Sequence, residues 1–473
     1  MIMGLWQTVS RPLLLSGKEE HSMDTIAAIA TPRGVGGVSM IRISGDRAAC
    51  IADAVFKTKV PPSKAQPNLL QYGSVMDGDK VLDHGMCVLM HAPHSFTGED
   101  VAELHVHGGM HLTDRVLQCV LDAGARMALP GEFTRRAFMN GKIDLPRAEA
   151  IGDLIHGLAD ATLSTAINQL EGRLSSAINR LRDQIIDITA QLSVAADYPE
   201  EDIPYLTGDT FRHALMDISA SLGELIASAR GGQMMRDGVR CAIVGRPNTG
   251  KSSLLNAMTG TYRAIVTPMA GTTRDIVEAT VSLGGMAVTL GDTAGMREGE
   301  AEAEKLGIAL AKEYAEKADF CLVVLDSSRI EAEDREILSL VQEKPHIVVL
   351  NKKDIAVYEG QIEGECVAIS TVTGDGLSAL EEAIVRLIDR VFLQGGALRQ
   401  ADAVCITNTR QRDGAVKAKE AIDFALQTLA DGFPPDLTAV DLENAAKCLG
   451  EITGLCVSEE VISRIFEKFC LGK

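Results

Sequence analysis

A chain of 473 residues is long enough for about three domains of ordinary size. Its 46% hydrophobic and 23% charged residues are typical of a protein that folds around hydrophobic cores, which excludes a largely disordered chain. The formal net charge of -19 argues against broad, non-specific adhesion to nucleic acid or anionic membranes, because both are bound through basic surfaces. If RNA is involved, we expect a small basic patch or a partner that makes most of the contacts.

The ten cysteines are scattered along the chain and form no CxxC pair, which favours reduced thiols in a cytosol over a disulfide framework. No apolar run is long enough to span a bilayer, so we expect no membrane segment. Residues 1–23 contain a short apolar stretch without a clear cleavage site, and we interpret them as a loose N-terminal extension. A cytoplasmic protein is therefore expected.

Residues 24–140 mix short β-rich runs, such as TIAAIA and VAELHVH, with glycine and proline turns, which predicts a small α+β domain. From Pro146 to Leu192, apolar residues recur at steps of three, four or seven, which predicts one or two long amphipathic helices packed on other helices. The acidic run DYPEEDIP at 197–204 interrupts this pattern and predicts a solvated turn.

Another helix is expected at about 209–230, and the pair Gly231-Gly232 after it is interpreted as a hinge. Apolar strands then alternate with helical segments from Val239 to about residue 392, which predicts a doubly wound parallel sheet. After residue 400 the chain is again helical. The simplest fold is multidomain, with an α/β P-loop (Ras-like) G domain inserted into an all-α helical domain. The predicted boundaries are 24–140 for the α+β N-terminal domain, 141–232 and 394–473 for the two parts of the helical domain, and 233–393 for the G domain.

The stretch GRPNTGKSS at 245–253 follows an apolar strand and opens a helix, which is the context of a phosphate-binding loop. Gly245 and Gly250 allow backbone N–H groups to approach phosphates. Lys251 is expected to reach the β- and γ-phosphates, and the Ser252 hydroxyl to bind Mg²⁺.

Three further motifs follow in the order of a GTP hydrolase. GTTRD at 271–275 offers Thr273 as a second magnesium ligand, and DTAG at 292–295 offers Asp292 near the metal and the Gly295 N–H near the γ-phosphate. NKKD at 351–354 offers the Asp354 carboxylate to guanine N1–H and N2–H₂, which adenine cannot supply. A buried carboxylate there would strongly disfavour ATP. The predicted nucleotide contacts are Asn248, Thr249, Gly250, Lys251, Ser252, Ser253, Thr267, Thr272, Thr273, Asp292, Thr293, Ala294, Gly295, Asn351, Lys352, Asp354, Ser370, Thr371 and Val372.

The residue after DTAG raises a question about catalysis. Ras-like proteins carry a glutamine there that orients the attacking water, whereas this chain has Met296, whose thioether cannot do so. Either the chain is a slow switch, or another group supplies the missing function.

The stretches DTIAAIATPRGVGGVSMIRISG (24–45), FTGEDVAELHVHGG (96–109), PGEFTRRAFMNGKIDL (130–145) and FCLGK (469–473) resemble the tRNA-modification GTPase family MnmE, also called TrmE. The resemblance runs from Asp24 to the end of the chain. It implies that a monovalent cation, usually K⁺, replaces an arginine finger. The K⁺ ligands implied are Asn248, Thr267, the carbonyl of Met269, and Thr272, whereas spacing alone favours a turn-forming role for Asn248.

The resemblance also implies a catalytic carboxylate before a basic-aliphatic-glycine triplet, and Glu304 matches because Lys305-Leu306-Gly307 follows it. Its neighbours Glu298, Glu300 and Glu302 are rivals, and without the resemblance the acidic run reads as a solvated helix face. Two positions depart from the family pattern. Pro268 stands where aspartate is frequent, and Thr371-Val372 replaces an alanine-basic pair, so we expect guanine contacts there to rest on the backbone.

The family's N-terminal domain dimerises and binds a 5-formyltetrahydrofolate or a related one-carbon folate. The positions that match its folate contacts are Arg42, Glu103, Lys142 and the terminal Lys473. Arginine and lysine can pair with folate carboxylates and glutamate with the pterin amino groups. Without the resemblance, ordinary surface ion pairs are an equally good interpretation.

Two other features have competing interpretations. His105, His107 and His111 could suggest a metal site, but no carboxylate or cysteine cluster completes the set, so we favour a part of the folate domain. Cys470 near Lys473 is either a nucleophile with a lowered pKa or a small buried hydrophobe, and the two interpretations carry equal weight.

The function implied is a K⁺-stimulated, Mg²⁺-dependent GTPase that acts as a homodimer with the partner MnmG (GidA), which uses FAD and NADH. Together they would add an aminomethyl or carboxymethylaminomethyl group at C5 of the wobble uridine of certain tRNAs, with the tRNA held mainly by the partner. The alternative is a regulatory GTPase switch in ribosome assembly or stress signalling with a vestigial folate domain. A pure folate-binding scaffold is a third possibility.

Overall fold

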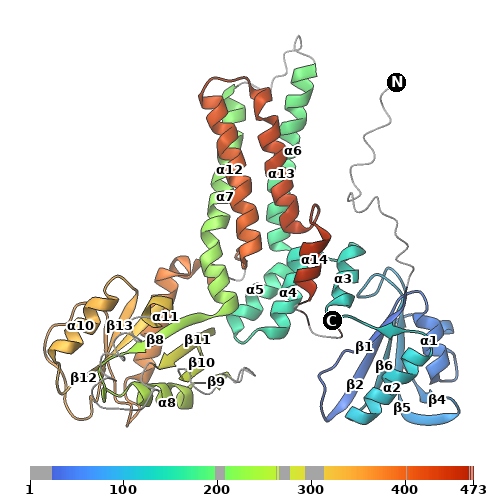
Figure 1. Cartoon of the computed structure of the whole chain (residues 1–473), viewed down its shortest axis with the longest axis horizontal. Helices are drawn as coiled ribbons and strands as arrows, with labels where there is room; N and C mark the ends of the chain where they lie inside the picture. Colours follow the sequence, from blue (N-terminus) through green and yellow to red (C-terminus); the bar gives the residue numbers. More distant parts are fainter. Residues whose placement is uncertain are drawn as a thin grey trace. The chain divides into compact units, whose positions relative to one another are not determined.

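The computed structural model describes residues 24–197, 208–262, 264–265, 277–292, 314–400, 402–467, 469 and 472. The chain forms two compact units, Met1–Gly152 with Ala446–Lys473, and Asp153–Ala445. This division groups the last residues with the N-terminal ones, and the domain boundaries inferred from the sequence remain predictions. Figure 1 colours the elements along the chain.

The first unit contains a seven-stranded sheet in the order β3-β4-β5-β6-β2-β1-β7, antiparallel except for the β1–β7 pair. Helices α1 and α2 bury their apolar residues against the sheet in one core. This is the α+β arrangement that the alternating β-rich runs predict. The strands are β1 (Ile26–Ile29), β2 (Gly36–Ser44), β3 (Phe56–Lys57), β4 (Gln71–Asp77), β5 (Lys80–Met90), β6 (Val101–Gly108) and β7 (Arg126–Met127), and the helices are α1 (Ala48–Val55), α2 (Met110–Asp122) and α3 (Glu132–Met139).

The C-terminal helix of the chain belongs to this unit. Helix α14 (Glu459–Phe466) packs on α3, and the Phe138 and Phe466 rings lie 6.3 Å apart between centroids. Gly472 lies against the end of β1, since a Cβ added there would be 2.2 Å from the carbonyl oxygen of Ile29. Gly472 therefore lies beside the strand next to β2.

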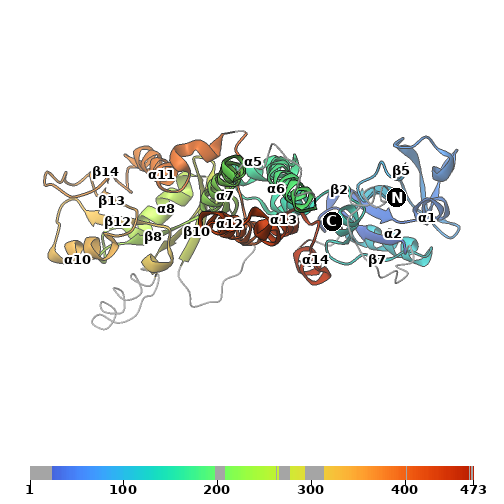
Figure 2. The same cartoon turned by 90° about the horizontal axis from the view of Figure 1, so that it is seen from above.

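The second unit contains a bundle of long helices. Figures 1 and 2 show α7 (Gly208–Asp237) and α12 (Thr409–Ala430) side by side. The sequence predicted one or two helices between Pro146 and Leu192, and the structure has three. The remaining helices are α4 (Leu145–His156), α5 (Asp160–Leu170), α6 (Arg173–Asp197) and α13 (Ala439–Thr453), of which α4 and α13 cross the boundary between the two units.

Gly172, with a φ of 83°, separates α5 from α6. The hinge prediction at Gly231-Gly232 is wrong, because α7 runs through both residues. A Cβ at Gly231 would lie 2.6 Å from the carbonyl oxygen of Phe392, and one at Gly232 would lie 2.1 Å from that of Ile406. These glycines permit close packing of chain segments, not bending. Of the acidic run at 197–204, Asp197 is the last residue of α6, and 198–204 lie outside the described residues.

The second unit also contains the seven-stranded sheet β14-β13-β12-β8-β11-β10-β9, with buried apolar residues in a core on each face. The five strands from β14 to β11 are parallel, as predicted, whereas β10 and β9 pair antiparallel, so the sheet is mixed. The elements are β8 (Val239–Val244), α8 (Lys251–Thr261), β9 (Ala264–Ile265), β10 (Val277–Leu283), β11 (Met286–Asp292), β12 (Phe320–Asp326), α10 (Ala332–Val341), β13 (His346–Asn351), β14 (Cys366–Ala368), α11 (Leu377–Val391) and the 3₁₀ helix η2 (Gln394–Arg399).

Among the residues that the structure describes, no helix is both long and apolar enough to cross a membrane.

Candidate active site

The phosphate loop joins the end of β8 to the start of α8, and its backbone has three left-handed residues. The φ angles are 155° at Gly245, 63° at Asn248 and 99° at Gly250. A Cβ at Gly245 would lie 2.3 Å from the carbonyl oxygen of Val324 in β12, so only glycine fits against the neighbouring strand. The loop therefore takes its shape from glycine positions that the sequence motif specifies.

Side chains inside the loop hold its backbone. The Lys251 ammonium donates to the carbonyl oxygens of Gly245 and Arg246, each at 2.8 Å. The Thr249 hydroxyl donates to the same Arg246 oxygen at 2.9 Å. Lys251 and Thr249 are both buried. The predicted phosphate-binding lysine is thus positioned at the loop, as the motif requires.

Asn351 joins the phosphate loop to the base-contacting loop. Its Nδ2 donates to the carbonyl oxygen of Thr249 at 2.9 Å, and its Oδ1 accepts from the Thr371 N–H at 3.2 Å. The side chain is almost completely buried at the end of β13. One amide therefore connects two of the motifs identified in the sequence.

The lysines of NKKD bind neighbouring carboxylates. Lys352 donates to Asp326 at 2.5 Å, and Lys353 to Asp375 at 2.9 Å. Burial raises the pKa of Asp326, but hydrogen bonds from Lys352 and Ser328 outweigh it, so the pKa is lowered.

Asp354 and the 370–372 segment complete the described part of the base site. Asp354 is exposed in the turn that follows β13, and its pairing with guanine remains a prediction. Ser370 is buried, and its hydroxyl accepts the N–H of Val372 at 3.3 Å. Val372 itself is exposed. The loop is thus shaped by Ser370 and by Asn351, which binds Thr371.

The remaining predicted residues lie at the ends of described elements or beyond them. Asp292 is the last residue of β11 and lies opposite Ile243 of β8, near the strand end that precedes the phosphate loop. Ser252 and Ser253 lie in the first turn of α8. The predicted residues outside the described part of the chain are Thr267, Met269, Thr272, Thr273, Thr293, Ala294, Gly295, Glu304, Cys470 and Lys473.

The residues present fit the two implied cations. Asn248 is exposed in its left-handed position and makes no hydrogen bond to another described residue, so its amide oxygen is an available hard donor. Ser252, at the start of α8, contributes a hydroxyl oxygen, a ligand type that Mg²⁺ accepts beside phosphates.

In the first unit, Arg42 and Glu103 lie directly opposite each other on β2 and β6. Arg42 Nε donates to Glu103 Oε1 at 2.9 Å, and its guanidinium lies 5.2 Å from the Phe96 ring centre and 5.8 Å from that of Phe133. Burial raises the pKa of Glu103. The hydrogen bond from His105 and the charge of Arg42 lower it by more, so the net shift of the pKa is downward.

Lys142, predicted to share the folate pocket, is exposed and donates to the carbonyl oxygen of Pro93 at 2.7 Å. Pro93 and Phe96 belong to the same segment between β5 and β6, so that segment contacts both Lys142 and Arg42. The structure therefore pairs Arg42 directly with Glu103, and it connects Lys142 to Arg42 through this segment.

The histidines of β6 bind carboxylates. His107 Nδ1 lies 2.8 Å from Asp83 Oδ1, and His105 Nε2 lies 3.5 Å from Glu103 Oε2.

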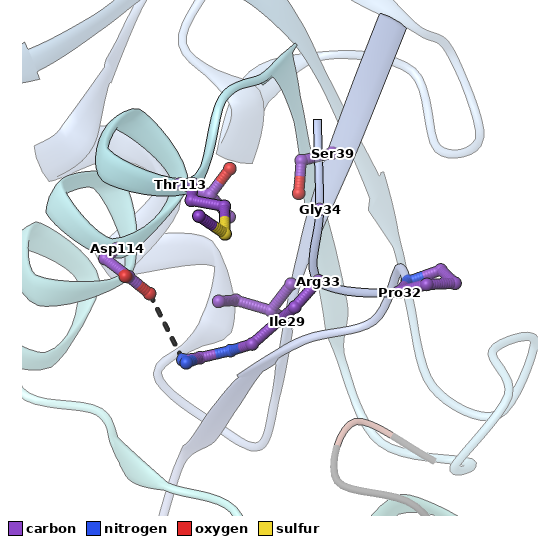
Figure 3. A pocket seen from close by; sticks show the side chains of 8 residues that line it. Ile29, Pro32, Arg33, Gly34, Ser39, Thr113 and Asp114 are labelled. Carbon is purple, nitrogen blue, oxygen red and sulfur yellow. Dashed lines mark hydrogen bonds and ion pairs between the residues drawn. The ribbon is translucent and has the colours of Figure 1, made fainter. Parts of the chain in front are cut away.

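Figure 3 shows a small cavity between the β1–β2 connection and the start of α2, where Arg33 reaches Asp114 at 3.2 Å. Its volume of about 30 Å³ has room for water but not for a folate.

Sequence reasoning missed the anchoring role of Arg246. Its guanidinium pairs with Asp334 and Glu331 at the start of α10. The spacing of Glu331 and Asp334 is that of a helix capping box, which marks the start of α10 but not its arginine partner.

Comparison with known proteins covers nearly the whole chain. The family model described as "GTP-binding protein TrmE N-terminus" matches residues 25–142, and that described as "MnmE helical domain" matches residues 145–470. The tRNA modification GTPase MnmE of Roseiflexus sp. (strain RS-1) is 43% identical over 468 residues, which are 95% of this chain and 99% of the relative. The protein of the same name from Lactiplantibacillus plantarum is 40% identical over 461 residues, with 95% and 98% covered.

Proposed function

The chain belongs to the MnmE family of tRNA modification GTPases, and from this premise we propose that it is a Mg²⁺-dependent, K⁺-stimulated GTPase that modifies tRNA together with a second protein. That it is a GTPase follows from the family. The observation that best supports the nucleotide site is the Asn351 amide, which joins the phosphate loop to the base-contacting loop.

The described residues have separate roles in this proposal. Lys251, held at the phosphate loop, neutralises charge on the β- and γ-phosphates. Ser252 supplies a hydroxyl to Mg²⁺, and the exposed Asn248 amide supplies an oxygen to K⁺. A bound monovalent cation provides a fixed positive charge against the charge that develops on the phosphates, which is the chemistry of an arginine finger. Asp354 accepts hydrogen bonds from guanine.

For the water that Met296 cannot orient, we propose Glu304, which lies outside the described residues. Glu304→Ala should retain GTP affinity and lose turnover, because a carboxylate that orients water acts only in the transition state. Glu302→Ala is the matched control from the same acidic run and should turn over GTP normally. An unchanged kcat in Glu304→Ala would remove Glu304 from the mechanism.

We further propose that the first unit binds a formyl-tetrahydrofolate and that the chain works as a homodimer. The paired Arg42 and Glu103 and the nearby Lys142 provide groups that suit folate carboxylates and pterin amino groups. Arg42→Ala should weaken folate binding without changing GTP binding, since the two sites lie in different units. Equilibrium dialysis with 5-formyltetrahydrofolate measures the first effect.

The complete reaction that we propose adds an aminomethyl or carboxymethylaminomethyl group at C5 of the wobble uridine of certain tRNAs. The partner is a flavin- and NADH-using MnmG (GidA) protein that makes most of the tRNA contacts, consistent with the net charge of -19. Nucleoside analysis of tRNA from a deletion strain tests this reaction. Unaltered wobble uridine would favour the alternative, a regulatory GTPase switch.

A further inference from the structure

Arg246 is part of the phosphate loop, yet its side chain binds a different element. Its Nε donates to Asp334 Oδ1 at 2.8 Å, and one terminal nitrogen lies 2.8 Å from Glu331 Oε2. The other terminal nitrogen donates to the carbonyl oxygen of Arg329 at 3.0 Å. The guanidinium is thus held by three groups at the start of α10.

The acceptor side of this contact is rigid. Asp334 is fully buried, and its second carboxylate oxygen accepts the Glu331 N–H at 2.9 Å, which caps α10. The Arg246 side chain is only 15% exposed. Its pKa is raised, mainly by the hydrogen bond with Asp334. Buried, charge-assisted hydrogen bonds of this kind contribute more than exposed ion pairs.

The backbone of the same residue supports the nucleotide-binding side chains. The carbonyl oxygen of Arg246 accepts from the Lys251 ammonium at 2.8 Å and from the Thr249 hydroxyl at 2.9 Å. Two residues later, Asn248 holds a left-handed backbone that carries a cost for any residue with a side chain. A shift of Arg246 would move the oxygen on which Lys251 rests.

We infer that Arg246 is a positioning residue that fixes the phosphate loop to the start of α10. The loop then has its nucleotide-binding conformation before the nucleotide binds. Arg246 acts through Lys251, Thr249 and the loop backbone rather than by touching the phosphates. Preorganisation of this kind raises affinity, because the loop does not have to be ordered on each binding event. Among variants of one site, affinity differences lie mostly in the rate of ligand release.

The test uses the full-length chain with three substitutions, Arg246→Ala, Arg246→Lys and Glu331→Gln. Arg335→Ala is the matched control, because Arg335 is an exposed arginine on α10. Release of N-methylanthraniloyl-GDP is followed by stopped-flow fluorescence. Hydrogen exchange of the 245–253 amides and the melting temperature are measured on the same samples.

We expect GDP release to be about 10-fold faster in Arg246→Ala, with faster exchange confined to residues 245–253. GDP release in Arg246→Lys should be slower than in Arg246→Ala but faster than in the unsubstituted chain. An ammonium keeps the positive charge but cannot donate to several acceptors in one plane as a guanidinium does. Arg335→Ala should match the unsubstituted chain. Exchange that increases evenly through the whole sheet would mean a merely structural role and overturn the inference.

If Arg246→Ala does not fold, Glu331→Gln decides the question. It weakens the partly exposed contacts of Glu331 with Arg246 and Arg329, keeps an amide oxygen that can cap α10, and leaves Asp334 intact. About 3-fold faster GDP release with an unchanged melting temperature supports the positioning role. An unchanged release rate in a folded Glu331→Gln protein overturns it.

Discussion

The nucleotide site and the charged cluster of the first unit are held together in different ways. In the nucleotide site, two buried polar side chains bind backbone: Lys251 binds the Gly245 and Arg246 oxygens, and Asn351 binds Thr249 and Thr371.

The charged cluster is defined here as Asp24, Glu99, Arg126, Glu132 and Arg136, and its side chains bind one another. Arg126 contacts Glu132 at 2.6 Å and also pairs with Asp24, whereas Arg136 contacts Asp24 at 2.6 Å and Glu99 at 3.1 Å. A site built on backbone shape is sensitive to a single added carbon atom. A cluster built on charge is sensitive to pH.

The largest effect is expected for Gly245→Ala. The added Cβ would lie 2.3 Å from the Val324 oxygen. This clash cannot be relieved, because that oxygen belongs to a buried strand. Overpacking costs about 1–3 kcal/mol, and a left-handed backbone with a side chain costs about 1–2 kcal/mol more. We expect a lower melting temperature and loss of GDP binding, measured by differential scanning calorimetry and fluorescent-nucleotide titration.

Gly260→Ala in α8 is the control, because no atom lies within 4 Å of the place that its added Cβ would occupy. It should leave nucleotide binding unchanged and stabilise the helix by up to about 1 kcal/mol. Equal behaviour of the two variants would contradict a site determined by backbone shape.

The second prediction concerns the Asn351 amide. Asn351→Ala leaves the Thr249 carbonyl and the Thr371 N–H without their partner, and each unsatisfied buried group costs about 1–3 kcal/mol. Asn351→Asp has nearly the same shape and keeps the acceptor but loses the donor to Thr249. We expect both variants to bind GDP at least about 10-fold more weakly in an equilibrium titration. Unchanged affinity in the aspartate variant would show that the link to Thr249 is dispensable.

The third prediction is the pH response of the charged cluster. Burial raises the pKa of Glu132. Hydrogen bonds from Arg126 and the Leu129 N–H lower it by more, so the pKa lies below the ordinary value of 4.5. A lowered carboxylate pKa stabilises the folded state above that ordinary value, and the stabilisation is lost as pH falls through the lowered folded value. The first unit should therefore be equally stable from pH 7 to 5 and weaken below about 4.5.

Glu132→Gln should lower the free energy of unfolding by about 2 kcal/mol at pH 7, which is typical of losing a hydrogen bond to a charged group. It should also flatten the acid response, as measured by urea unfolding across pH. The matched control is Glu460→Gln, in an exposed pair with Arg464 on α14. An acid response that is identical in the native protein and Glu132→Gln would contradict a role for this carboxylate.

The smallest effect is expected for Arg33→Ala. Arg33 and Asp114 line the cavity of Figure 3, but both side chains are more than half exposed. Exposed pairs contribute about 0–1 kcal/mol and are screened by salt. The melting temperature should hardly change, and any change should vanish in 1 M NaCl. A large, salt-independent loss would show that this pair is structural.

The sequence predicted the phosphate loop better than it predicted the Arg42–Glu103 pair of the first unit. The positions of Gly245, Gly250 and Lys251 followed from the strand-loop-helix context, because a phosphate loop needs glycines at fixed places. Arg42 and Glu103 were identified only through the family resemblance, since their pairing depends on the register of two strands distant in sequence.

Other errors also came from tertiary contacts. Gly231 and Gly232 suggested flexibility, but close approach of Phe392 and Ile406 keeps them helical. The strand β10, with the sequence VEATVSL, was missed because it pairs antiparallel with β11 and so departs from the parallel alternation that the sequence predicts. The Arg246 anchor was missed because the phosphate-loop motif carries no information about α10.

The central proposal is that an alkali cation at Asn248 supplies the charge that an arginine supplies in other GTPases. Initial rates of GTP hydrolysis in KCl and in NaCl at equal ionic strength test it most directly, with Asn248→Ala and GDP binding measured in parallel. We predict hydrolysis about 10-fold or more faster in KCl, with the difference lost in Asn248→Ala while GDP binding remains. Equal rates in the two salts, with the protein folded and saturated with GTP, would contradict the proposal.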